Sequence, residues 1–189
     1  MFTKFALLIY NESMSFAKIP IGKKAPEIVN VVVEIPKGSH NKYEYDEELD
    51  EIKLDRVLYS AVFYPTDYGF IPETRSKDGD HLDVLIISSE PVFPGCIIEA
   101  KPISILYMED EAGIDEKIIA ISTKDPYTDE IESIDDVDKN FKNEIHEFFK
   151  TYKRLEHKEV TVKGWSGKAK AIDIIKEAQK RYQKELSVE

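Results

Sequence analysis

The chain has 189 residues and a formal net charge of −11, from 37 acidic and 26 basic residues. With 42% hydrophobic and 11% aromatic residues it can bury the core of one ordinary domain, which excludes an intrinsically disordered chain. Basic and acidic residues alternate along the whole sequence, so neither nucleic acid nor an anionic membrane is an expected partner.

The single cysteine, Cys96, excludes an internal disulfide and is typical of a cytoplasmic protein. No apolar run approaches the length of a membrane-spanning helix. The first residues, MFTKFALLIYNES, resemble a signal peptide only faintly, because their apolar part is short and no small-residue cleavage site follows. We therefore treat residues 1–13 as an N-terminal extension of unknown role and predict a single domain over residues 14–189.

From Ile28 to about Ile121 the sequence predicts strands, because its segments are rich in β-branched and aromatic residues or alternate between apolar and polar. The expected strand segments are 28–36, 42–46, 52–65, 81–89, 96–108 and 117–123. Two hairpin connections are expected between them, through EELDE at 47–51 and through EDEAGIDE at 109–116.

The pattern changes after Pro126, where apolar side chains recur at the spacings of one helix face from Ile134 onward. These side chains are Phe141, Ile145, Phe148, Tyr152 and Leu155. A short strand at 159–165 is expected next, then Ser166 as the N-cap of a helix over 169–186. Many short strands followed by two helices predict an α+β protein, with a barrel or a strongly bent sheet.

The stretch DGDHLDVL places Asp78, Asp80 and Asp83 directly before and within the start of an apolar run. In an extended chain Asp78 and Asp80 project to the same side, and a bent loop can bring Asp83 beside them. Two carboxylates about 5 Å apart repel each other by roughly 3 kcal/mol at an effective dielectric constant near 20. Such a cluster must take up protons or hold cations, and oxygen ligands favour Mg²⁺ or Mn²⁺ over zinc.

A solvated Asp-Gly turn is the alternative interpretation, but it does not account for Asp83 at the onset of the apolar run. A calcium-binding EF-hand is excluded, because Leu82 and Asp83 would stand at a ligand position and at the obligatory glycine. The acidic residues of 109–116 would, by themselves, be interpreted as a solvated hairpin loop.

DGDHLDVL also resembles the signature D-G-D-P-x-D-V-L of the soluble (family I) inorganic pyrophosphatases. Around it stand, in the family's order, the segments VVVEIP, NKYEYD, LDR, FYPTDYGFIP, MEDEAGIDEK, TYKRLE and VKGW. The resemblance extends from about Met14 to the C-terminal helix. It implies a five-stranded OB-like β-barrel with additional strands and two C-terminal helices packed against it. The implied activity is Mg²⁺-dependent hydrolysis of pyrophosphate to two orthophosphates by a metal-activated water, without a covalent intermediate.

The resemblance also implies roles for individual residues. The implied metal ligands, for several Mg²⁺ ions with Mn²⁺ as a possible substitute, are Asp78, Asp80, Asp83, Asp110, Asp115 and Glu34. The implied substrate-binding residues are Lys42, Arg56, Lys117, Tyr152, Lys153, Tyr64 and Glu44. The implied catalytic residues are Asp80 as general base, Tyr68 with a hydrogen bond near Asp80, and Arg56.

One residue departs from the family signature, because His81 stands where the family has proline. Histidine restores a backbone N–H and adds a group that titrates near neutrality, so it could loosen the metal loop or couple metal affinity to pH. A solvated His81 without effect is the alternative.

Three other functions are left open by the sequence. They are an OB-type module that binds an oligonucleotide or a protein, an inactive pyrophosphatase used as a scaffold, and a phosphoanhydride hydrolase acting on ATP or short polyphosphate. The resemblance further implies a homohexamer.

Overall fold

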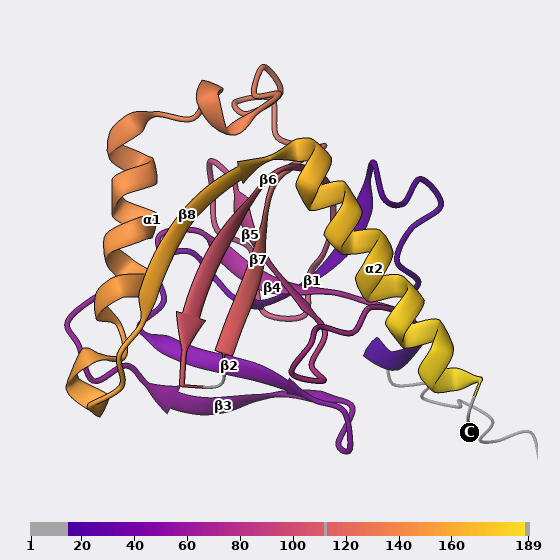
Figure 1. Cartoon of the computed structure of the whole chain (residues 1–189), viewed down its shortest axis with the longest axis horizontal. Helices are drawn as coiled ribbons and strands as arrows, with labels where there is room; N and C mark the ends of the chain where they lie inside the picture. The colour runs from indigo at the N-terminus through magenta and orange to yellow at the C-terminus, as the bar shows by residue number, and fades with distance from the viewer. Residues whose placement is uncertain (1–14, 112, 188–189) are drawn as a thin grey trace, which may run out of the picture.

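This computed structural model describes residues 15–111 and 113–187, and these residues contain eight β-strands and two α-helices (Figure 1). The strands are β1 (Val29–Ile35), β2 (Asn41–Asp46), β3 (Glu51–Val57), β4 (Asp67–Ile71), β5 (Leu82–Ile87), β6 (Ile97–Asp110), β7 (Gly113–Ser122) and β8 (Thr161–Gly167). The helices are α1 (Lys139–Thr151) and α2 (Lys168–Leu186), with 3₁₀ turns at Phe16–Lys18, Ile134–Asp136 and Arg154–Glu156.

Five of the strands close into a barrel. They are hydrogen-bonded in the order β1-β4-β5-β7-β6, and β6 pairs back onto β1 through the register Val29 opposite Ala100. Only β5 and β7 are parallel among these five pairings. β8 adds to β6, while β2 and β3 form a separate hairpin. The predicted α+β fold with a five-stranded OB-like barrel is therefore confirmed.

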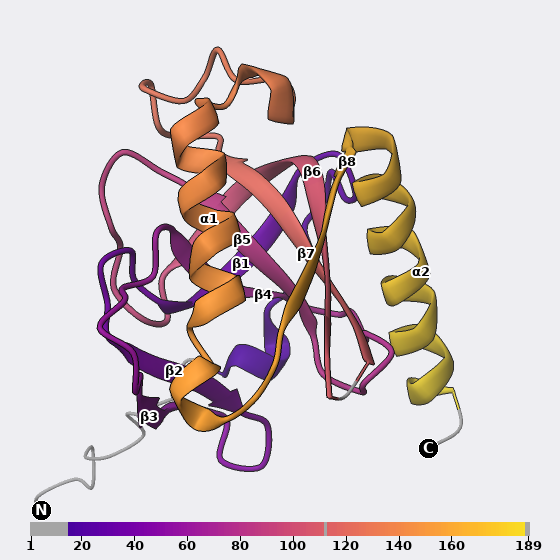
Figure 2. The same cartoon turned by 60° about the vertical axis from the view of Figure 1, so that its left-hand side comes forward.

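Two apolar cores position the helices on different sides of the barrel (Figures 1 and 2). The buried face of α2, which includes Ala171, Ile174 and Ala178, packs on barrel strands. The buried face of α1, which includes Ile145 and Phe149, packs on a second cluster with side chains of β4 to β7. Each helix therefore covers a different part of the barrel with its own apolar core.

The sheet is irregular where β1 passes β4. The register shifts between Val33 and Ile35, so Glu34 is the extra residue of a bulge. Opposite it, Gly69 has no room for a side chain, because a Cβ there would lie 2.0 Å from the Val32 carbonyl oxygen. A bulge changes the direction of a side chain, and here the bulged residue is Glu34, whose carboxylate is buried.

Several element predictions are wrong at their boundaries. The strand expected over 52–65 ends at Val57, and β4 was not expected at all. The segment 109–116 is mostly strand, because β6 continues to Asp110 and β7 begins at Gly113. These strands are longer than the apolar runs that predicted them, because backbone pairing does not require apolar side chains.

The helical part also differs from the prediction in two places. The single helix expected from Ile134 onward is divided into a 3₁₀ turn, α1 and a second 3₁₀ turn. Leu155, expected on its apolar face, is exposed. The N-cap of α2 is Gly167 rather than Ser166, which belongs to β8. The expected extension over residues 1–13 lies outside the described residues. Within residues 15–111 and 113–187, no helix is long and apolar enough to cross a membrane.

Candidate active site

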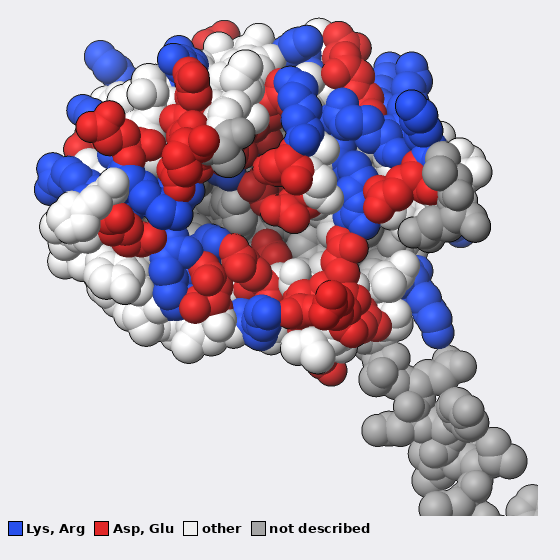
Figure 3. Space-filling model, turned by 60° about the horizontal axis from the view of Figure 1, so that its bottom comes forward, with Lys and Arg blue, Asp and Glu red and all other residues white. Residues whose placement is uncertain are grey.

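A cavity of about 640 Å³ opens between the end of the barrel and the β2–β3 hairpin. Asp and Glu side chains gather around this hollow, with Lys and Arg side chains beside them (Figure 3). Thirteen of the fourteen residues predicted for the site line it: Glu34, Lys42, Glu44, Arg56, Tyr68, Asp78, Asp80, Asp83, Asp110, Asp115, Lys117, Tyr152 and Lys153. The structure thus brings together side chains from β1 to β7 and from the end of α1.

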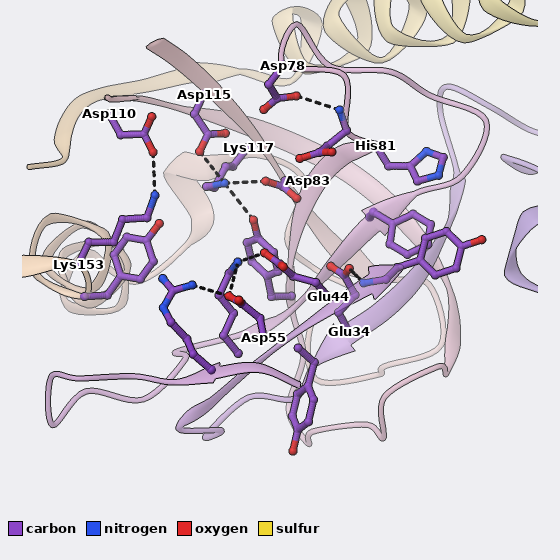
Figure 4. Close-up of a pocket in the computed structure, with 18 of the residues that line it drawn as sticks. Glu34, Glu44, Asp55, Asp78, His81, Asp83, Asp110, Asp115, Lys117 and Lys153 are labelled. Atoms are coloured by element: carbon purple, nitrogen blue, oxygen red, sulfur yellow. Dashed lines mark hydrogen bonds and ion pairs between the residues drawn. The ribbon is translucent and has the colours of Figure 1, made fainter. Parts of the chain in front are cut away.

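Lys117 connects two of the aspartates (Figure 4). Its Nζ lies 2.7 Å from Asp83 Oδ2 and 2.9 Å from Asp115 Oδ2, and it donates a 2.9 Å hydrogen bond to the Tyr68 hydroxyl. Only 3% of Lys117 is exposed. Burial alone lowers the pKa of its amine, but the Asp115 and Asp83 carboxylates outweigh burial and raise it well above its ordinary value. Lys117 is therefore a fixed positive charge in the cavity wall.

A second set of cations lies on the hairpin. Lys42 and Arg56 are cross-strand partners in β2 and β3. Lys42 is hydrogen-bonded to Glu44 and lies 3.2 Å from Asp55, which also pairs with the Arg56 guanidinium. For Lys42, burial lowers the pKa of the amine, but its two carboxylate partners raise it by more.

At the end of α1, Lys153 Nζ lies 2.7 Å from Asp110 Oδ2, an interaction drawn in Figure 4. Its neighbour Tyr152 is the C-cap of α1 and is 5% exposed, so its ring belongs both to the apolar core and to the cavity wall. The cation of Lys153 lies 5.5 Å from the centre of this ring.

The acidic side chains carry more negative charge than their surroundings readily stabilise. Glu34 is buried and accepts a 2.7 Å hydrogen bond from the Tyr45 backbone N–H. Burial, assisted by the nearby Asp83 carboxylate, raises the pKa of Glu34 to about 8. Burial, together with Asp78 and Asp83, also raises the pKa of Asp80. The cavity therefore favours either protons or added cations at these groups.

The carboxylates surround the cavity rather than meeting at one point. Within residues 15–111 and 113–187, no three carboxylate, histidine or cysteine side chains form a ready-made group for one metal ion. Asp83 and Asp115 are instead separated by Lys117 (Figure 4). The donors are all oxygen atoms, which fits a hard divalent cation, and binding such an ion at Asp83 would compete with Lys117.

Two tyrosines are placed differently from the expectation. Tyr64 does not line the cavity; it is 3% exposed and packs edge-on against Tyr68, with ring centres 5.7 Å apart. The Tyr68 hydroxyl, expected near Asp80, accepts its hydrogen bond from Lys117. Burial raises the pKa of Tyr68 well above its ordinary value, so its phenol keeps its proton at neutral pH.

His81 is not solvated, because only 14% of its side chain is exposed. Its ring stacks on Phe70 with centres 4.8 Å apart and planes 13° apart. Figure 4 shows the ring turned away from the Asp83 and Asp115 carboxylates. The interpretation of His81 as a solvated residue is therefore wrong.

The sequence interpretation missed four charged residues at this site. Asp55 and Glu156 hold Arg56, the latter through a 3.1 Å ion pair with Nε, while Glu47 and Lys158 line the cavity. Asp55 stands in the segment LDR directly before Arg56, and Glu156 stands in TYKRLE three residues after Lys153. Adjacency to a predicted cation was an available signal for Asp55, whereas Glu156 had no such signal.

The fold and the cavity can be compared with known proteins. A family model described as inorganic pyrophosphatase matches residues 31–183. The chain belongs to this family. The resemblance to the family I inorganic pyrophosphatases is therefore confirmed.

Similar pyrophosphatases cover most of the chain. The inorganic pyrophosphatase of Methanosarcina acetivorans is 49% identical over 156 residues, which are 82% of this chain and 93% of that protein. The inorganic pyrophosphatase of Saccharolobus solfataricus is 49% identical over 167 residues, 87% of this chain and 97% of that protein. The crystal structure of the Thermus thermophilus inorganic pyrophosphatase superposes with a TM-score of 0.87 at 46% identity, covering 89% of this chain and 99% of the other.

Proposed function

We propose that this chain hydrolyses inorganic pyrophosphate to two orthophosphates with the help of bound divalent cations, Mg²⁺ first and Mn²⁺ as a substitute. The observation that carries the proposal is the mixture of charges in one cavity, where buried Lys117 stands between two aspartates. A polyanion such as pyrophosphate can bind lysine and arginine directly, whereas carboxylates can approach it only through metal ions.

We assign the metal ions to the oxygen donors of the cavity wall. The proposed ligands are Asp78, Asp80, Asp83, Asp110 and Asp115, with Glu34 for an additional ion. The raised pKa values of Glu34 and Asp80 support this assignment, because burial and neighbouring carboxylates disfavour the charged form of each group and a nearby divalent cation would favour it. When bound, the ions neutralise pyrophosphate and lower the pKa of a coordinated water.

The substrate is assigned to the cations and phenols that face the same space. Lys42 and Arg56, side by side on the hairpin, bind one phosphate, and Lys117, Lys153 and Tyr152 bind the other. Each of the four cations is held in place by a carboxylate, Glu44 among them, which reduces the ordering that substrate binding requires. Tyr64 supports this arrangement from behind Tyr68.

We assign Asp80 as the general base. The family resemblance supports this assignment, and Asp80 lines the same cavity as the cations assigned to the substrate, within reach of a water that attacks it. A water attacks one phosphorus atom and gives its proton to an Asp80 carboxylate oxygen, and the bond from that phosphorus to the bridging oxygen breaks. Lysine and arginine then stabilise the charge on the departing orthophosphate, with Tyr68 as a neutral hydrogen-bonding group.

We also propose a single domain over residues 14–189, a homohexamer and a cytoplasmic location. The family match to residues 31–183 supports the domain proposal. The homohexamer rests on the family resemblance, and light scattering would test it. The cytoplasmic location rests on the single cysteine of the chain. Side activity on ATP or short polyphosphate is an alternative that the sequence leaves open.

The proposed function is tested by orthophosphate release from pyrophosphate, with Mg²⁺ and with EDTA. The parent should release orthophosphate only with Mg²⁺, and Asp80→Asn should lower the rate about 10²–10⁴-fold, the usual contribution of a positioned general base. Asp173→Asn, an equal charge change at an exposed position of α2, is the control and should retain the parent rate. No release by the parent with any divalent metal would contradict the proposal.

A further inference from the structure

The turn that carries Asp78 and Asp80 is exposed, yet both of its ends are fixed. Residues 77–80 are all exposed, and the turn is closed by a 2.7 Å hydrogen bond from the Ser76 N–H to the Asp80 carbonyl oxygen. Inside it, the Asp80 N–H donates to Asp78 Oδ1 at 3.1 Å. Lys77, in the same turn, pairs with Glu116 of β7 at 3.0 Å. The position of these two carboxylates therefore depends on this pair and on the residues that flank the turn, Arg75 and His81.

Helix α2 holds the backbone of Arg75 from both sides. The Arg75 N–H donates a 3.0 Å hydrogen bond to the Ala178 carbonyl oxygen. The Arg75 carbonyl oxygen accepts a 2.7 Å hydrogen bond from Arg181 Nε. These two contacts attach the start of the turn to the C-terminal half of α2, although Arg75 and Arg181 are 106 residues apart in sequence.

The Arg75 side chain joins three segments. Its two terminal nitrogens donate to Glu47 at 2.5 and 2.9 Å, in the connection between β2 and β3. Its Nε donates to Glu185 at 2.8 Å, near the end of α2, and its guanidinium lies 5.5 Å from the centre of the Tyr182 ring. Only 13% of the Arg75 side chain is exposed. A planar, forked and mostly buried donor of this kind fixes geometry as well as charge.

His81 fixes the other end of the turn. Its Nδ1 lies 2.9 Å from the Thr74 carbonyl oxygen, and its Nε2 lies 3.0 Å from Glu47 Oε1. Thr74 is fully buried, and its hydroxyl oxygen accepts a 2.9 Å hydrogen bond from the Leu82 N–H. Glu47 therefore contacts the residues at both ends of the turn.

We propose that Arg75 is a positioning residue for the metal-binding turn. Through Glu47 and Glu185 it fixes Asp78 and Asp80 relative to the hairpin that carries Lys42 and to α2. The proposal rests on the proposed function, because it takes Asp78 and Asp80 as metal ligands. Residues that orient ligands in this way govern metal affinity without touching the ion.

The test is the affinity of the whole chain for Mn²⁺ alone, measured from the electron paramagnetic resonance signal of free Mn²⁺. Arg75→Gln should weaken the tightest binding about tenfold, as is typical for partners of metal ligands. The Mg²⁺ concentration for half-maximal pyrophosphate hydrolysis should rise by a similar factor, with a smaller change in kcat at saturating Mg²⁺. Arg75→Lys, which keeps the charge but not the fork, should recover part of the affinity.

Two further variants separate positioning from stability. Glu132→Gln removes the Lys101–Glu132 pair, which at 2.8 Å matches the Arg75–Glu185 distance, and it should leave Mn²⁺ affinity unchanged. Glu185→Gln, at a half-exposed site, should fold like the parent and still weaken Mn²⁺ binding about threefold, near the effect of losing one surface ion pair.

The possible outcomes distinguish this inference from the proposed function. If Arg75→Gln lowers the Tm but binds Mn²⁺ as the parent does, the Arg75 contacts are structural only and the inference is overturned. If Arg75→Gln does not fold, unchanged Mn²⁺ affinity in Glu185→Gln overturns it. A parent that binds Mn²⁺ and hydrolyses pyrophosphate supports the proposed function in either case. A parent that does neither overturns both.

Discussion

Burial acts on the acids and bases of the cavity in opposite ways. It raises the pKa of Glu34 to about 8, so this carboxyl keeps its proton at neutral pH. It acts to lower the pKa of Lys117, but the Asp115 and Asp83 carboxylates prevent the amine from losing its charge. Without divalent cations the residues thus reduce the net charge of the cavity by retaining a proton on one acid and by pairing two others with a lysine.

Glu34 makes stability depend on pH in the metal-free protein. Its pKa is about 8 in the folded state and ordinarily 4.5, so the folded state binds more protons between these limits and unfolding becomes easier as pH rises. At about 1.4 kcal/mol per pKa unit, the expected loss of unfolding free energy between pH 5 and 8 is roughly 3–4 kcal/mol. Glu34→Gln should remove this loss, as measured by urea unfolding in EDTA at both pH values.

The control for Glu34 is Glu90→Gln, the same substitution at an exposed position. It should retain the parent's pH dependence. An identical pH dependence in Glu34→Gln and in the parent would show that Glu34 is not the group responsible.

At the scale of elements, the contact of β1 with β4 has the strictest steric requirement. The bulge at Glu34 and the glycine at position 69 occur together, because the backbone of β1 occupies the space that a Cβ at position 69 would need. β4 also carries Tyr68, so this contact determines how a cavity tyrosine sits beside the bulged carboxylate. A strand of five residues thereby contributes both to the core and to the cavity wall.

Gly69→Ala should destabilise the protein by about 3 kcal/mol or more, because overpacking against rigid backbone cannot be relieved by a rotamer change. Gly167→Ala is the matched control, since a Cβ there has no neighbour within 4 Å. It should cost only about 1 kcal/mol, because Gly167 is the N-cap of α2, where alanine is less favourable than glycine. Urea denaturation compares the two, and equal stability of both variants would contradict the steric argument.

At the scale of the whole molecule, the two cores have different relations to the cavity. Phe149 of α1 contacts the rings of Tyr68 and Tyr152, with centres 6.5 and 5.6 Å away, and lies 5.7 Å from Lys117 Nζ. Ile174 of α2 is equally buried but belongs to the other core. One core therefore supports the cavity wall directly, and the other chiefly holds α2 on the barrel.

Phe149→Ala and Ile174→Ala should both destabilise the fold, by about 3–5 and 2–5 kcal/mol respectively. Only Phe149→Ala should also lower kcat for pyrophosphate well below the unfolding temperature, because the removed ring contacts Tyr68 and Tyr152. Thermal unfolding and orthophosphate release measure the two effects separately. An equal loss of kcat in Ile174→Ala would mean that the cores are not separable.

The sequence by itself determined the fold class, the family and thirteen of the residues that line the cavity. Apolar runs predicted four of the barrel strands, because burial on both faces of a strand requires continuous hydrophobic sequence. The charge repulsion among Asp78, Asp80 and Asp83 predicted a site for protons or cations before any neighbour was known. Both signals are local, so they can be read from consecutive residues.

Only the tertiary structure decided which charges meet. The pairs Arg56–Glu156 and Arg75–Glu185 join residues 100 and 110 positions apart. No local sequence pattern predicts either pair. The position of Tyr64 also depended on the tertiary structure. It was expected to bind substrate, but it packs behind Tyr68, which lines the cavity. Side-chain pairing depends on how the barrel closes, which requires the simultaneous positions of strands that are distant in sequence. That is why the aspartates could be predicted and the network that holds them could not.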